Sequence, residues 1–331
     1  MNNNETVVDV KNLKVHFPVY QGIFGNVINS VKAVDDVSFS IKRGEIFSLV
    51  GESGCGKTTV AHSILGLIHK TSGSIKLSVG KWKESSIEWE NLSNSEKREL
   101  RKQIQVVFQD PYSSLNPRMN IQRILEEPFI IHKICTKQER TKRIIKLLNN
   151  VGLSTEYLNR YPHEFSGGQR QRIGIARALA TEPELIIADE PVSALDVSIQ
   201  AQIINLLQDL RSSFNQTLLF ISHDLAVVRH IADRLAVMYL GKIVESGTET
   251  QIFDSPRHPY TSLLLQSIPV PGKGRCNRNI TVSEDKNKVA IERGCSFFGR
   301  CPLRTDNCLD HIPPLQDIGD GHFVSCYNVQ K

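Results

Sequence analysis

The glycine-rich stretch GESGCGKTT at residues 51–59 constrains what this chain can fold into more than any other feature. It follows the apolar run IFSLV, which is typical of a buried parallel strand, and it opens a helical pattern. This order, with the pattern G-x-x-x-x-G-K-[ST], is typical of a loop whose backbone N–H groups wrap around phosphates. In such a loop Lys57 reaches the β- and γ-phosphates, and the hydroxyl of Thr58 binds Mg²⁺. The residues that we expect around the phosphates are Gly51, Ser53, Gly54, Cys55, Gly56, Lys57, Thr58 and Thr59.

Apolar runs of the same kind recur at residues 104–108, 185–189 and 217–222. Helical patterns separate these runs, and strands that alternate with helices predict a parallel sheet with helices on its faces. The fold class that we predict is therefore α/β, with the phosphate loop following one of the buried strands.

Two stretches near the N-terminus, residues 7–17 and 33–41, alternate apolar and polar side chains. This alternation is typical of half-buried strands, so both stretches are predicted to be strands. The residues between them, 18–32, lack the alternation. We expect them to form a loop or a short insertion.

Changes of pattern divide the chain into a core, a helical insertion and an extension. Residues 111–165 have a mainly helical pattern, which predicts a helical subdomain inserted between two parts of the core, residues 1–110 and 166–247. Residues 248–331 form a smaller C-terminal extension. Within it, the polar and charged residues 271–292 are predicted to be a linker.

The composition narrows the class of protein only a little. Of the 331 residues 40% are hydrophobic and 23% charged, which is ordinary for a soluble globular protein. The net charge of +5 permits nucleic acid, anionic ligands or a membrane surface as partners and selects none of them. No stretch approaches the roughly 18 apolar residues of a membrane span, and the N-terminal MNNNETVVDV has no apolar signal core. We expect a cytosolic protein that does any membrane work through a partner.

Two carboxylates end the apolar run LIIADE at residues 185–190. Asp189 stands at the end of the predicted strand, where a phosphate-loop protein holds Mg²⁺. Glu190 is one residue further on, so it points elsewhere and suits a base that polarises an attacking water. The alternative is an acidic helix cap before Pro191, which the nearby phosphate loop makes the minor interpretation.

The stretch FSGGQRQRIGIARAL, residues 165–179, places two glycines at the start of a predicted helix. One interpretation is a helix cap, with Ser166 as the N-cap and Gly167–Gly168 as a tight entry turn. The other is an anion seat, because free N–H groups at a helix start attract phosphate. The basic side chains of this helix are expected to face solvent: Arg170, Arg172 and Arg177.

The stretch FSGGQ resembles the signature motif of ATP-binding cassette (ABC) ATPases, usually written LSGGQ, with Phe in place of Leu. Other motifs of that family stand in order along residues 12–247. Gln109 in VFQDP resembles the Q-loop glutamine, Asp196 in SALD the D-loop and His223 in FISHD the switch histidine. Phe17 in LKVHF stands where the family places an aromatic ring that stacks on adenine. Gln109 and His223 could instead be polar residues at strand ends, and Phe17 could be part of the core.

This resemblance implies an ATPase that uses ATP and Mg²⁺. Its fold would be a phosphate-loop core of parallel sheet and antiparallel β subdomain, with an inserted helical subdomain. Gln109 would join Thr58 and Asp189 at Mg²⁺, and Glu190, His223 and Gln109 would form the catalytic group. Two cassettes of the family pair head to tail, so one chain alone should hydrolyse ATP poorly. The residues that would contact ATP bound to the other cassette are Ser166, Gly167, Gly168, Gln169 and Asp196.

A closer resemblance links almost the whole chain to ATPase subunits of bacterial oligopeptide and dipeptide importers, a group that includes nickel importers. It is carried by stretches such as FQDPYSSLNPRMNI, DEPVSALDVSIQAQIINLL and SPRHPYTSLLL. It implies two membrane permeases, a second homologous ATPase subunit, an extracytoplasmic peptide-binding protein, and a peripheral place on the cytoplasmic face of the cell membrane. It implies no nucleic acid partner. A metal-chelate cargo, a soluble ABC ATPase acting on nucleic acid, and a non-catalytic cassette remain alternatives.

Four cysteines cluster near the C-terminus with the spacing C-x5-C-x6-C-x17-C: Cys295, Cys301, Cys308 and Cys326. In a reducing cytosol such a cluster indicates metal ligands before disulfides. Zinc sites commonly contain a C-x2-4-C pair, which is missing here, whereas an iron–sulfur cluster accepts varied spacings. The importers' C-terminal region is also associated with a [4Fe-4S] cluster in some members. We place a [4Fe-4S] cluster first, zinc second and buried thiols without metal third, with Cys276 as a substitute ligand.

Overall fold

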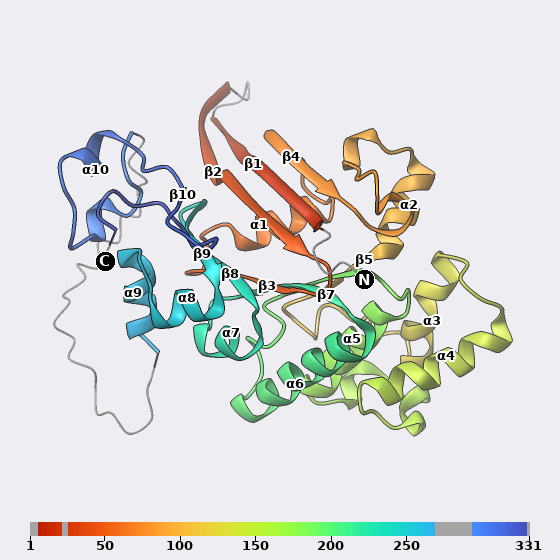
Figure 1. The fold of residues 1–331 in the computed structure, drawn as a ribbon. Helices are drawn as coiled ribbons and strands as arrows, with labels where there is room; N and C mark the ends of the chain where they lie inside the picture. Colours follow the sequence, from red (N-terminus) through yellow and green to blue (C-terminus); the bar gives the residue numbers. More distant parts are fainter. Residues whose placement is uncertain (1–5, 22–25, 269–292, 330–331) are drawn as a thin grey trace.

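The computed structural model describes residues 6–21, 26–268 and 293–329 (Figure 1). The predicted linker at residues 271–292 and the alternative ligand Cys276 lie outside these described residues. Among the described residues, no helix is both long enough and apolar enough to cross a lipid bilayer.

The centre of the fold is an eight-stranded sheet, in which five neighbouring strands, β8, β3, β7, β6 and β5, run parallel. The four predicted buried strands are among these five, and β3, β6 and β7 are buried along their whole length. The predicted parallel sheet is thereby confirmed. In spatial order the strands are β10 (Gln316–Asp317), β11 (Phe323–Val324), β9 (Lys242–Thr248), β8 (Arg234–Tyr239), β3 (Ile46–Val50), β7 (Thr217–Ser222), β6 (Leu185–Asp189) and β5 (Ile104–Val107).

A second, antiparallel sheet has the order β2-β1-β4, with β1 at Thr6–Gln21, β2 at Asn26–Lys42 and β4 at Ser72–Leu77. For the described residues of the stretch 18–32 the expectation of a loop is wrong, because β1 extends to Gln21, β2 begins at Asn26, and Pro18 pairs with Ser30. Strand β4 pairs with β1 only as far as Lys14. Beyond Lys14, β1 pairs with β2 alone, and none of the described side chains at residues 16–19 and 29–32 is buried. A buried face therefore does not impose on these residues the alternation by which strands are recognised.

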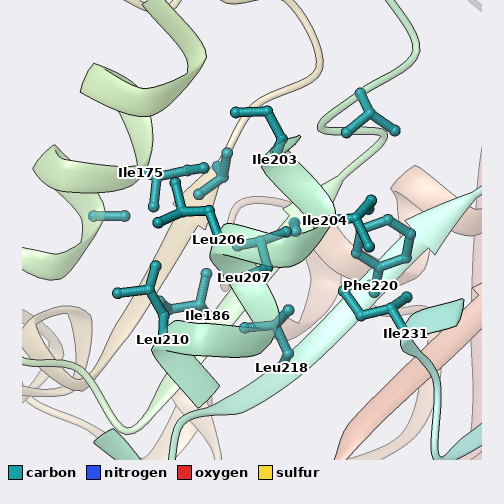
Figure 2. Close-up of a cluster of buried hydrophobic side chains, with 14 of the residues drawn as sticks. Ile175, Ile186, Ile203, Ile204, Leu206, Leu207, Leu210, Leu218, Phe220 and Ile231 are labelled. Atoms are coloured by element: carbon teal, nitrogen blue, oxygen red, sulfur yellow. The ribbon is translucent and has the colours of Figure 1, made fainter. Parts of the chain in front are cut away.

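Side chains of the central sheet alternate between two hydrophobic clusters, one on each face. Leu218 and Phe220 belong to the cluster beneath α5, α6 and α7, whereas Leu219 and Ile221 belong to the cluster shared with α1 and the antiparallel sheet. Figure 2 shows the first cluster, where one side of α6 covers β6 and β7. The side chains that α6 contributes there are Ile203, Ile204, Leu206, Leu207 and Leu210.

The helices lie on both faces of the central sheet and in the two added regions (Figure 1). Their bounds are α1 (Lys57–Ile64), α2 (Asn94–Gln103), α3 (Ile121–Ile131), α4 (Lys137–Asn150), α5 (Gly167–Leu179), α6 (Val197–Phe214), α7 (Leu225–Ile231), α8 (Glu249–Asp254), α9 (Pro259–Gln266) and α10 (Asn307–Asp310). Short 3-10 turns are η1 (Gly80–Trp82), η2 (Trp89–Asn91), η3 (Thr155–Asn159), η4 (Pro162–Glu164) and η5 (Phe298–Arg300).

Helices α3 and α4 lie within the predicted helical insertion and pack on α5. The expectation that the arginines of α5 face solvent is wrong. Nε of Arg170 donates to the carbonyl oxygen of Pro162 at 2.7 Å, and Nη1 of Arg172 donates to that of Val151 at 2.7 Å. Arg177 reaches a third carbonyl, and its burial lowers its pKa. These side chains fasten α5 to the inserted segment because each satisfies a loop carbonyl.

The C-terminal extension continues the central sheet. Strand β9 runs on to Thr248, and β11 pairs with β9 antiparallel. The fully buried carboxylate of Glu245, on β9, accepts the backbone N–H of His258 at 3.0 Å and lies 2.8 Å from Nε2 of His322. One buried carboxylate thus connects the core to both ends of the extension, which explains why the sheet does not end with the core.

Candidate nucleotide-binding site

The phosphate loop begins where the buried strand β3 ends, and it leads into α1. Its glycines have left-handed backbone angles, with φ of +151° at Gly51 and +109° at Gly56. A Cβ atom would lie 2.3 Å from the carbonyl oxygen of Met238 at Gly51 and 2.2 Å from that of Ala33 at Gly56. Both positions therefore require glycine, because the backbone of a neighbouring strand occupies the space of a side chain.

Lys57 is buried at the start of α1 and lies against the loop. Its Nζ donates to the carbonyl oxygens of Gly51 at 2.8 Å and Glu52 at 3.1 Å, and it lies 3.8 Å from Sγ of Cys55. Burial raises the pKa of the Cys55 thiol, although the ammonium of Lys57 opposes this shift. Cys55 is thus a small buried thiol that packs under the loop.

Two oxygen-bearing side chains meet beside the loop. The hydroxyl of Thr58 donates to Oδ1 of Asp189 at 3.3 Å. Asp189 ends β6 and is buried, and burial raises its pKa while the Thr58 hydroxyl lowers it. Mg²⁺ is usually held by one or two protein oxygens together with phosphates and water. The pair therefore fits Mg²⁺ that arrives with a nucleotide.

Three polar side chains converge at the carboxyl ends of β5, β6 and β7, which are neighbours in the sheet. Nε2 of Gln109 donates to Oε2 of Glu190 at 3.0 Å, and Nδ1 of His223 lies 3.2 Å from Oε1 of the same carboxylate. Glu190 has a left-handed φ of +46°, and its N–H donates to the carbonyl oxygen of Ile221. The carboxylate is therefore held at the sheet edge where α/β proteins bind ligands.

A cavity of about 570 Å³ contains this group. It is lined by Glu52, Ser53, Gln109, Glu190, Ser193, Ala194, His223 and Leu264. A neighbouring hollow holds Thr58, Asp189 and the other side of Gln109. The structure therefore brings the predicted phosphate, magnesium and catalytic residues together at one edge of the sheet.

The signature stretch is shaped as a helix cap. Ser166 and Gln169 form a reciprocal cap, in which the N–H of Gln169 donates to Oγ of Ser166 at 3.3 Å. A Cβ atom at Gly168 would lie 2.4 Å from Cγ2 of Ile199, and one at Gly167 would lie 3.2 Å from Cδ2 of Leu195. The glycines therefore have a packing reason inside the chain. None of residues 166–169 lines the two cavities at the phosphate loop.

Two other predicted contacts lie outside these cavities. Asp196 is the exposed N-cap residue of α6. Phe17 lies on β1 opposite Val31 and is 41% exposed, so it is not part of the core. An exposed ring leaves a face free for stacking, and the contact of Phe17 with adenine stays a prediction.

Sequence reasoning missed three residues of the C-terminal extension that reach this site. Leu264 lines the cavity of Glu190. The hydroxyl of Tyr260 accepts the N–H of Glu52, and Arg300 forms an ion pair with the carboxylate of Glu52. These contacts join residues 208 and 248 positions apart, so no local pattern could have indicated them.

The four C-terminal cysteines are free thiols, and Cys308 is buried. Burial, reinforced by the other three sulfurs, raises the pKa of Cys326 to about 11. In the described part of the chain, no group of three or more His, Cys, Asp or Glu side chains could hold a metal ion. The predicted [4Fe-4S] cluster and the zinc alternative therefore find no support. Cys295 and Cys301 are partly buried and pack against the hydrophobic core.

A parallel sheet whose central strand opens into a phosphate loop, with an Asp and a Glu at the next strand end, defines the class of phosphate-loop ATPases. The sequence profile described as "ABC transporter" matches residues 34–193, and the one described as "Oligopeptide/dipeptide transporter, C-terminal region" matches residues 244–308. The chain belongs to the ABC transporter family and is an ATP-hydrolysing cassette.

Relatives match along nearly the full length. The oligopeptide transport ATP-binding protein AppF of Bacillus subtilis is 49% identical, with 98% of each chain covered. The oligopeptide transport ATP-binding protein OppF of Haemophilus influenzae is 45% identical, covering 99% of this chain and 98% of its own. Among solved structures, the ATP-binding cassette MJ0796, a dimer bound to ADP and Pi, is 30% identical with a TM-score of 0.62. It covers 73% of this chain and 98% of its own.

Proposed function

We propose that this chain is the ATP-hydrolysing subunit that powers import of oligopeptides or dipeptides through a membrane ABC transporter. The observation that carries the proposal is the Glu190 carboxylate, held between Gln109 and His223 beside the phosphate loop. The peptide cargo is supported by the full-length likeness to peptide-transport ATPases and by the match of residues 244–308.

ATP binds with its phosphates in the loop of residues 51–59. Lys57 turns its ammonium from the loop carbonyls toward the β- and γ-phosphates. Thr58, Asp189 and Gln109 would hold Mg²⁺, which would neutralise charge on the phosphates. Glu190 accepts a proton from the attacking water. The water oxygen bonds to the γ-phosphorus while the bond from this phosphorus to the β–γ bridging oxygen breaks, so that ADP and phosphate are released. Gln109 and His223 keep the carboxylate directed at the cavity. His223 contacts the γ-phosphate from the end of β7.

The ATP site is completed by a second, homologous cassette. Residues 166–169 lie outside the cavity of their own chain, and Ser166 presents a helix start that suits an anion. In a head-to-tail pair, Ser166, Gly167, Gly168 and Gln169 of one cassette contact the γ-phosphate bound to the other, and Asp196 lies at the same contact. Phe17 stacks on the adenine ring.

The partners in the membrane are two permeases, served by an extracytoplasmic peptide-binding protein, and the chain lies peripherally on the cytoplasmic face of the cell membrane. Support comes from exposed apolar side chains beside Gln109 and on α3, namely Phe108, Tyr112, Ile130 and Ile131. Phe108 and Ile131 line one hollow together with Gln109, and exposed apolar side chains gathered at a hollow favour a contact surface. The chain needs no nucleic acid in this role.

Uptake by the reconstituted transporter tests the proposal. Vesicles that contain the two permeases and both ATPase subunits receive the binding protein and a labelled oligopeptide, a labelled dipeptide or Ni²⁺. We expect ATP-dependent peptide uptake, and no uptake with Glu190→Gln in both cassettes. Uptake of Ni²⁺ in place of peptide would favour the metal cargo. ATPase activity that responds to DNA and ignores the permeases would contradict the transport function.

A further inference from the structure

Two side chains of the C-terminal extension form hydrogen bonds with Glu52 of the phosphate loop. The hydroxyl oxygen of Tyr260, on α9, accepts a hydrogen bond from the Glu52 N–H at 3.1 Å. Nη1 of Arg300, on η5, donates to Oε1 of Glu52 at 2.9 Å. One contact fixes the backbone of Glu52 and the other fixes its side chain, so the extension determines where this residue lies.

The Tyr260 ring and the Arg300 guanidinium are both held in place by neighbouring aromatic side chains. Tyr260 is fully buried, with its ring centroid 4.6 Å from that of Tyr239 and 5.4 Å from that of Phe297. The Arg300 guanidinium lies over the rings of Tyr239 and Phe297, at 5.7 and 5.8 Å. The three rings and the guanidinium form one packed unit. An aromatic unit of this kind holds the hydroxyl and the guanidinium in place at little further cost in side-chain entropy.

Glu52 links Tyr260 and Arg300 to the groups that are expected to bind phosphate. Its carbonyl oxygen accepts a hydrogen bond from Nζ of Lys57 at 3.1 Å, while its N–H is held by Tyr260. It also lines the cavity that contains Glu190. A shift of Glu52 would therefore move both the resting place of the Lys57 ammonium and the backbone N–H groups beside it.

We propose that Tyr260 and Arg300 are positioning residues of the ATP site, which hold the loop through Glu52 in its phosphate-binding shape before ATP arrives. A preformed site binds ATP more tightly because the loop loses no further conformational entropy when ATP binds. In this proposal the C-terminal extension supports the shape of the nucleotide-binding site. This inference rests on the proposed placement of ATP at residues 51–59.

The affinity of the full-length chain for a fluorescent ATP analogue, with and without Mg²⁺, tests the inference. Because the pair is partly exposed, we expect Arg300→Gln to weaken binding about fivefold. The same change should raise KM for ATP in the assembled transporter and leave kcat within about twofold. Tyr260→Phe, which keeps the ring and removes the acceptor, should also weaken binding.

Coupling between the two residues separates positioning from a general structural effect. Glu52→Gln combined with Arg300→Gln should cost no more affinity than the larger of the two single changes, because both disrupt the same ion pair. The exchange Glu52→Arg with Arg300→Glu should restore most of the affinity. The matched control is Arg304→Gln, which removes a charge from the same segment at a side chain that lies over Phe298. Thermal melting without nucleotide checks that each variant is folded.

Lys57→Ala distinguishes failure of the inference from failure of the site. If Lys57→Ala loses binding while Arg300→Gln binds as wild type, the positioning role is wrong and the site stands. The role is equally wrong if the effects of Glu52→Gln and Arg300→Gln multiply, or if Arg304→Gln weakens binding as much. If Lys57→Ala binds as wild type, ATP does not bind at this loop and the inference falls with the site.

Discussion

The carboxylate of Glu190 lies 3.2 Å from Nδ1 of His223, although the two residues follow different strands of the sheet. Strands β6 and β7 pair in parallel, so the residues just beyond their ends come together. Gln109 follows β5 and donates to the other carboxylate oxygen. The sheet topology therefore builds the catalytic group from three separate parts of the chain.

Replacing Glu190 by Gln should abolish turnover without abolishing ATP binding. Glutamine has nearly the same shape but cannot accept the proton of water, so kcat of the assembled complex should fall by about 10²–10⁴. Phosphate release measures turnover, and a fluorescent ATP analogue measures binding. The control is Glu182→Gln, because Glu182 is an exposed glutamate that pairs with Arg143. Turnover of Glu190→Gln at the wild-type rate would remove Glu190 from the mechanism.

The Gly168→Ala change should destabilise the fold because of packing within the chain. The new Cβ would lie 2.4 Å from Cγ2 of Ile199, so one of the two must move. Overpacking of this kind costs about 1–3 kcal/mol of the free energy of unfolding. The matched control on the same helix is Gly174→Ala. A Cβ there meets nothing within 4 Å, and we expect a gain of about 0.5–1 kcal/mol.

Urea unfolding of the isolated chain measures both glycine variants. Shortening the opposing side chain, with Ile199→Ala in the Gly168→Ala background, should recover part of the loss. Equal stability of the two glycine variants would show that the close contact with Ile199 is absent in solution. In that case Gly168 would owe its identity to the contact between cassettes alone.

The buried ring of His258 should make stability fall in mild acid. Burial lowers its pKa from 6.5 to about 4, an effect that Glu245 partly opposes. Between these two pH values His258 is protonated in the unfolded chain but remains neutral in the folded chain. The free energy of unfolding should therefore decrease as pH falls from about 6.5 to about 4, by about 3 kcal/mol in total.

His258→Asn is the variant that isolates this term. Asparagine is a favourable N-cap and can accept the Tyr260 N–H that Nδ1 of His258 accepts, yet it does not titrate in this range. Unfolding free energies at several pH values, compared between wild type and variant, remove the contribution of other histidines. Parallel pH profiles would mean that His258 does not titrate as its burial requires.

Local patterns predicted the centre of the fold and its chemistry well. Strand β7, the phosphate loop and α5 are defined by their own residues, and the structure has them where the sequence predicted them. Thr58 and Asp189 meet as expected, because parallel strands bring their carboxyl ends to one edge. The sequence predicted the helix cap at the signature glycines but not the packing of Gly168, because its neighbour Ile199 stands thirty-one positions later.

The other features depend on contacts between distant residues, which produce no periodic pattern in the sequence. Strands β10 and β11 have two residues each, too short to show an alternation, yet β11 joins the sheet beside β9. The arginines of α5, of which Arg170 is buried and Arg172 and Arg177 are partly buried, have the same sequence pattern as solvated ones. Their burial follows from the loop carbonyls that they meet, such as that of Ser114 for Arg177.

The most direct test of the account is the ATPase rate of this chain alone and in mixture with the second cassette and the permeases. We predict that the isolated chain turns over slowly, because its Ser166 lies outside its own ATP cavity, and that the mixture is much faster. Ser166→Arg should lower the rate of the mixture. Full activity of the isolated chain, unchanged by the partners and by Ser166→Arg, would contradict an ATP site shared between two cassettes.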